Sequence, residues 1–117
     1  MIASAFAGSG EAQVIDPPDD APSNVSLYLQ PGNQVGLQWT NTVFLAETEI
    51  GFRADNTGTL EPTSVITKVA YGVTGYSTGE DATTGDVCTW WVRHRKGGVS
   101  SAWVKAALGS LSCGVEI

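Results

Sequence analysis

The sequence has 117 residues, six basic and twelve acidic side chains and a formal net charge of −6 at pH 7. A chain of this length builds one domain around a single core, and its acidic balance argues against a nucleic-acid partner, since a phosphate backbone requires a positive surface. No apolar run approaches the roughly 20 residues that span a bilayer, so we expect no membrane partner.

Residues 1–22 have no periodicity and read as an extended N-terminal arm. The segment is too polar to offset its ordering entropy, so we expect a neighbouring subunit to order it, although a crystal contact or its own domain would also do so. Ile2 and Phe6 are its candidate interface residues. Residues 1–8 lack the basic region and the length of a secretory leader, so we expect the chain to be made and kept in a cytoplasm, or to leave it by lysis or inside an assembly. The charged side chains of the arm are all acidic: Glu11, Asp16, Asp19 and Asp20.

From Asn24 onward apolar and polar residues alternate, which predicts strands. Turn signals such as Gln30-Pro-Gly-Asn33 and Asp55-Asn-Thr-Gly58 separate them, and residues 78–86 read as a polar loop. Leu37, Ile50 and Phe52 fall in the apolar phase and are predicted core residues. The pattern predicts seven strands, at 25–29, 35–40, 48–52, 63–69, 73–77, 88–95 and 99–108. Their spacing is typical of an antiparallel β-sandwich.

The last two predicted strands form a hairpin around Lys96-Gly97-Gly98. The hairpin carries three of the four tryptophans. Removing a Trp side chain from water is worth roughly 4–6 kcal/mol as an upper bound, so the core should pack on this hairpin.

Five motifs, in this order and spacing, resemble a fibronectin type III domain over roughly Ala21 to Leu108. The resemblance implies a seven-stranded antiparallel β-sandwich of the fibronectin type III or Ig-like class at residues 23–109, followed by a C-terminal tail at 110–117. It also places Trp39, Trp90 and Val92 in the core, and puts Cys88 where the family has its corner tyrosine. The motifs are Pro22 ahead of the first strand, Val35-Gly-Leu-Gln-Trp39, Thr48-Glu-Ile-Gly-Phe-Arg53, Trp90-Trp-Val-Arg93 and Gly98-Val-Ser-Ser-Ala-Trp103.

Cys88 and Cys113 are the only cysteines. A tail that folds back past Gly109 would bring the sulfurs into reach, since a disulfide needs Cα atoms within about 7 Å. In the alternative, Cys88 is a small buried hydrophobe and Cys113 is a free thiol.

If Trp90 and Val92 point inward, their odd-numbered neighbours point outward. A guanidinium group that stacks over an exposed indole ring contributes about 0.5–1 kcal/mol of stabilisation. This face is therefore predicted to hold a ladder of interleaved arginine and tryptophan side chains. The ladder either stiffens the sheet or forms a contact surface, because Trp and Arg anchor interfaces. Its predicted members, which are also candidate interface residues, are Trp91, Trp103, Arg53, Arg93 and Arg95.

The sequence offers no catalytic constellation, and we expect no enzyme, no cofactor and no metal site. His94 is the only histidine, and its inward phase near a strand end favours a structural role over a catalytic base. One histidine and two cysteines far apart in the sequence do not supply the four ligands of a structural zinc site. The acidic residues of the arm do not have the spacing of a Ca²⁺ loop.

These features favour a structural or interaction protein with protein partners, within a homo-oligomer or lattice. Small acidic sandwiches of this kind look like accessory virion proteins of tailed bacteriophages, such as capsid decoration, head-fibre or tail-associated subunits. We therefore expect a virion protein assembled in the host cytoplasm. The alternative is an extracellular or cell-surface module that recognises carbohydrate or protein through Trp91 and Trp103, although the surrounding arginines favour a closed ladder.

Overall fold

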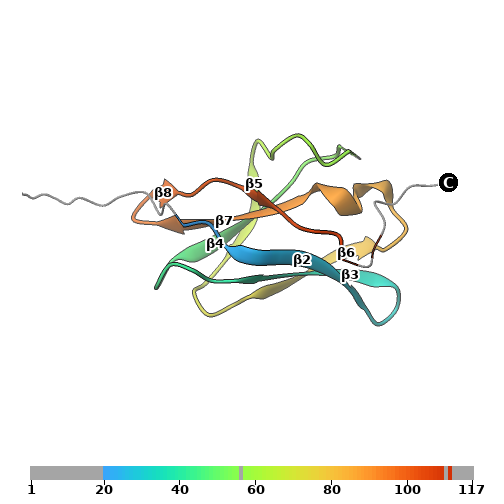
Figure 1. The fold of residues 1–117 in the computed structure, drawn as a ribbon, viewed down its shortest axis with the longest axis horizontal. Coiled ribbons are helices and arrows are strands. Elements are labelled where there is room, and N and C mark those ends of the chain that lie inside the picture. Colours follow the sequence, from blue (N-terminus) through green and yellow to red (C-terminus); the bar gives the residue numbers. More distant parts are fainter. Residues whose placement is uncertain (1–19, 56, 110, 112–117) are drawn as a thin grey trace, which may run out of the picture.

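The alternating residues form two antiparallel sheets that face each other (Figure 1). The structure is a computed structural model and describes residues 20–55, 57–109 and 111. One sheet has the order β2-β3-β6, with β2 at Ser23–Gln30, β3 at Gln34–Thr40 and β6 at Gly75–Asp81. The other has the order β5-β4-β7-β8, with β5 at Val65–Val69, β4 at Glu47–Phe52, β7 at Trp90–Lys96 and β8 at Val99–Ser100, and β9 at Val104–Lys105 also pairs with β7. The all-β architecture and the antiparallel pairing are as predicted.

Three predicted strands differ from the observed ones. The strand predicted at 73–77 is β6 at Gly75–Asp81, so it continues into the residues predicted as a polar loop. The last predicted strand is broken into β8 and β9, because Ser101 leaves the ladder and exchanges hydrogen bonds with His94 through both its backbone N–H and its hydroxyl. The described residues therefore contain eight strands rather than seven. The strand predicted from Cys88 begins only at Trp90, since residues Gly85–Thr89 form the 3₁₀ helix η1.

The β7–β8 turn has the conformation that its glycines predict. Gly97 and Gly98 both have positive φ, at 61° and 82°. A two-residue hairpin turn of type I′ needs φ above zero at both central positions, which glycine adopts without a steric penalty. The turn therefore returns the chain antiparallel to β7, with Val99 opposite Lys96.

The core lies between the sheets and contains the six predicted core residues. Leu37, Trp39, Ile50, Trp90 and Val92 are buried, and Phe52 packs against them at the end of β4. Register explains why they share a face, because directly opposed residues of an antiparallel pair point the same way. Ile50 lies opposite Val92, and Phe52 lies opposite Trp90, with ring centroids 4.9 Å apart.

One end of the sandwich collects the beginning of β2, the β3–β4 loop, the β5–β6 loop and the β7–β8 turn (Figure 1). Hydrogen bonds join them: the Thr42 hydroxyl donates to the Ala21 carbonyl at 2.8 Å, and Lys96 Nζ donates to the Phe44 carbonyl at 2.9 Å. We call this the loop end. The predicted arm residues Ile2 and Phe6 lie outside the described residues, as does the predicted tail, including Cys113, apart from Leu111.

Candidate functional site

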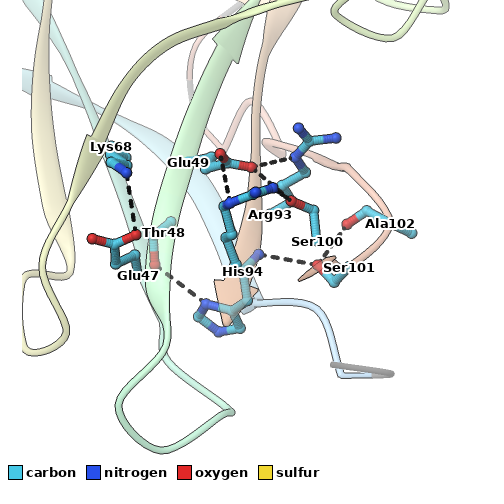
Figure 2. A network of polar contacts seen from close by, with 10 residues as sticks. Glu47, Thr48, Glu49, Lys68, Arg93, His94, Ser100, Ser101 and Ala102 are labelled. Atoms are coloured by element: carbon cyan, nitrogen blue, oxygen red, sulfur yellow. Dashed lines mark hydrogen bonds and ion pairs between the residues drawn. The ribbon is translucent and has the colours of Figure 1, made fainter. Parts of the chain in front are cut away.

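The outer face of the β4–β7 sheet carries part of the predicted ladder, and that part is organised around a carboxylate. Glu49 lies opposite Arg93 in the register, and its side chain is only 8% exposed. Arg93 Nε donates to Glu49 Oε1 at 2.7 Å, and the Ser100 hydroxyl donates to the same oxygen at 2.9 Å (Figure 2). Arg95 Nε lies 4.0 Å from Glu49 Oε2, and its Nη1 donates to Ser100 Oγ. One buried carboxylate therefore holds two arginines and a hydroxyl from β8.

The stacking predicted for this face forms between Arg93 and Trp103. The guanidinium carbon of Arg93 lies 4.2 Å from the centroid of the Trp103 ring. Arg53 follows the end of β4, and its Nη1 donates to the Glu61 carbonyl. The role of Glu49 was missed from the sequence, although an acidic residue in the outward phase of the predicted strand at 48–52 was a signal that could have found it.

Trp91 points to this outer face but does not meet solvent, so the prediction of an exposed Trp91 was wrong. Only 8% of the residue is accessible. Its two register neighbours, Gly51 and Lys105, both lie against the returning β4–β5 loop. A Cβ built on Gly51 would meet Pro62 and the Trp103 ring within 2.7 Å, and Gly58 lies beside the Lys105 ammonium.

Trp91 is buried because the β4–β5 loop, green in Figure 1, folds back over the outside of its own sheet. The glycine at position 51 leaves room for this close approach, because any side chain there would collide with the loop. This loop and the Trp103 ring lie over Gly51, the register neighbour of Trp91, which accounts for the low exposure of the indole. Since Trp91 is buried and Arg93 covers Trp103, these rings are poorly placed for stacking on a ligand.

His94 is fully buried at the loop end and takes part in a hydrogen-bond chain (Figure 2). Its Nε2 accepts the backbone N–H of Thr42 at 3.1 Å, which places the ring proton on Nδ1, 3.3 Å from Thr48 Oγ1. The Thr48 hydroxyl in turn donates to Asn41 Oδ1, which also accepts from the Trp39 indole. A neutral imidazole therefore fastens the base of the β3–β4 loop to β7.

Burial lowers the pKa of His94 below 6.5, and this outweighs the opposite effects of the Glu47 backbone and the Asp20 charge. The folded protein then binds fewer protons than the unfolded chain as the pH falls through about 6.5, so folding stability decreases with decreasing pH. We expect the melting temperature to fall between about pH 7.5 and pH 5.5, and to fall less in His94→Gln, which cannot titrate. The ring proton signals of the single histidine should report a midpoint below 6.5. Parallel pH profiles of the two proteins would contradict this assignment.

The predicted turn at Asp55 is held by its own carboxylate. The two oxygens accept hydrogen bonds from the backbone N–H groups of Thr57, Thr59 and Leu60 and from the Thr57 hydroxyl. These donors, the Thr57 hydroxyl first, lower the pKa of Asp55 to about 2. The carboxylate therefore shapes the start of the loop that covers Trp91.

The loop end presents an apolar patch to solvent, which the sequence patterns did not indicate. Phe44 is 68% exposed and Leu45 59% exposed in the β3–β4 loop, and Tyr71 and Val73 are 42% and 41% exposed in the β5–β6 loop. The rings of Phe44 and Tyr71 pack edge to face with centroids 5.5 Å apart, which joins the two loops. We call these four residues the loop-end patch.

The described residues contain no group of three or more metal-ligating side chains. Cys88 takes part in a disulfide, and the other cysteine of the sequence, Cys113, lies outside the described residues. No helix in the part of the chain that the structure describes is long and apolar enough to cross a membrane.

Comparison with known proteins finds no matching family model, no matching curated protein and no matching solved structure.

Proposed function

We propose that this chain is a non-enzymatic structural or interaction protein that makes its contacts through the loop end. The observation that carries the proposal is the loop-end patch. Four large apolar side chains, each at least 41% exposed, gather on two loops that are joined to each other and to β7. Clustered exposed apolar side chains on a rigid frame are characteristic of protein-interaction sites.

The frame beneath the patch supports a fibronectin type III-like sandwich. The first, second and fifth strands form one sheet, and the third, fourth, sixth, seventh and eighth strands form the other. Such an order needs connections that cross between sheets, as in Greek-key sandwiches. Trp39 and Trp90 lie in the core between the sheets, where the resemblance puts them. The patch would then lie on loops clustered at one end of the sandwich, the position from which such domains commonly bind.

The polar groups that suggest chemistry are engaged in holding the structure. Both ring nitrogens of His94 have hydrogen-bond partners, and the Glu49 carboxylate is paired with Arg93 and Ser100. His94 and Glu49 are also buried, which keeps both groups away from a substrate in solvent. This favours a binding role for the domain.

We place this role in the virion of a tailed bacteriophage, as a capsid decoration, head-fibre or tail-associated subunit in a homo-oligomer or lattice. A small acidic sandwich with a polar arm suits a repeated accessory subunit, since many weak contacts on one particle add up through avidity. The alternative, a carbohydrate- or protein-binding module at a cell surface, has less support, because Trp91 is buried and Arg93 covers Trp103.

Mass spectrometry of particles purified by density gradient from the native source tests this proposal. We expect the chain at a constant ratio to the major structural proteins through repeated gradients and after a high-salt wash. Soluble host proteins from the same lysate serve as the control and should be lost. If the chain is lost together with them, the virion assignment is wrong.

A further inference from the structure

We propose that the loop-end patch is the docking site for the N-terminal segment, residues 1–19, of a second copy of this chain. The inference rests on the proposed function and names the partner of that surface. Copies joined in this way would each give one segment and receive another, either reciprocally in a two-fold dimer or head-to-tail in a ring or a repeating lattice.

The β3–β4 loop holds its apolar side chains in a conformation that costs energy. Leu45 has φ of 63°, a left-handed backbone that is unfavourable for a leucine. Its side chain is nevertheless 59% exposed, so the strain is not offset by burial within the domain. Strained residues of this kind persist where the surrounding structure imposes them, and they cluster at binding sites.

Three contacts keep the loop in this shape before any partner arrives. Lys96 Nζ donates to the Phe44 carbonyl at 2.9 Å, and the N–H of Ala46 donates to the Val43 carbonyl at 3.2 Å. At the base of the loop, His94 accepts the N–H of Thr42. A preformed apolar surface loses little conformational entropy on binding.

The position and composition of the N-terminal segment point to it as the occupant. The Ala21 carbonyl is bonded to the Thr42 hydroxyl, so residues 1–19 join the domain beside the patch. Ile2 and Phe6, and further on Val14-Ile15, supply apolar side chains, and acidic residues follow at Asp16 and Asp19. The loop end carries Lys96, whose positive charge is complementary to these acidic residues.

The prolines next to the domain favour a neighbouring copy over the same chain. Pro17 and Pro18 have restricted φ, and each disfavours a helical conformation in the residue before it. Asp16 and Pro17, each of which precedes a proline, therefore favour an extended backbone, and an extended connection favours a neighbouring copy over the same chain. A fully extended residue spans about 3.3–3.6 Å, so residues 1–19 have the reach to cross to another copy.

A complementation experiment with two variants tests the proposal. The first variant lacks residues 1–15 and keeps the patch, and the second carries Phe44→Ser with Leu45→Asn and keeps the segment. Asparagine tolerates left-handed φ, so the second variant should fold at least as well as the native chain. Leu60→Ser is the matched control, because Leu60 is 49% exposed but lies in the β4–β5 loop.

Light scattering coupled to gel filtration measures the outcome. We expect the native chain and Leu60→Ser to self-associate as concentration rises, each variant alone to have a dissociation constant raised roughly tenfold or more, and their mixture to form a 1:1 complex. Association that survives either change overturns the proposal. So does a monomeric native chain whose N-terminal amides are protected from hydrogen exchange by its own patch.

Failure here is distinguishable from failure of the proposed function. If the native chain and the Phe44→Ser, Leu45→Asn variant are both retained on purified particles, the virion role stands and the docking site is wrong. If the complementation succeeds but the chain is absent from particles, the docking site stands and the virion role is wrong.

Discussion

Replacing Trp91 with alanine should lower the free energy of unfolding by about 3–5 kcal/mol, the range for removing a buried aromatic side chain. The residue is 8% exposed, and both of its register neighbours lie against the β4–β5 loop. The change would leave a cavity between that loop and the sheet, and partial collapse would recover only part of the loss. Urea denaturation followed by far-UV circular dichroism gives the value.

Two further variants identify the cause. Trp91→Phe keeps an aromatic ring and should lose less than half as much stability as the alanine variant. Trp103→Ala removes a less buried ring from the same face and should also cost less. An alanine variant with unchanged stability would mean that Trp91 is a free contact residue and that the loop does not cover it.

Glu49→Gln should lower the free energy of unfolding by about 2 kcal/mol, because hydrogen bonds to charged groups are worth about 1.5–3 kcal/mol. The amide keeps the size of the side chain but leaves Arg93 and Arg95 without their negative partner. Removing one partner of a buried pair is costly, since the remaining charge stays partly desolvated. The side chain of Arg93 is 25% exposed, and water reaching it limits the loss.

The same substitution at the neighbouring ion pair is the control. Glu47 pairs with Lys68 at 3.5 Å, but the two side chains are 45% and 56% exposed. An exposed pair of this kind contributes about 0–1 kcal/mol, so Glu47→Gln should be nearly neutral and its effect should shrink in salt. Equal effects at the two positions would show that burial does not strengthen the Glu49 network.

Much of the fold was predictable because it depends on local patterns. Alternation places Leu37, Ile50 and Val92 on the buried face, and this needs only the two-residue period of a strand. The glycines at 97 and 98 specify the turn through their positive φ. The strand order and the apolar patch were not predictable, because they depend on which segments meet in space.

By itself, the sequence determined the all-β class, the core residues and the tight turn of the β7–β8 hairpin, since each follows from a residue's own conformational preference or its distance from its neighbours. Only the tertiary structure decided that Trp91 is covered, that Glu49 holds two arginines, and that Leu45 is exposed in a left-handed conformation. The two-residue period of a strand predicts which face of the sheet a side chain lies on, but it does not predict what packs on that face. A loop that returns over its own sheet covers the part of the predicted outer surface where Trp91 lies.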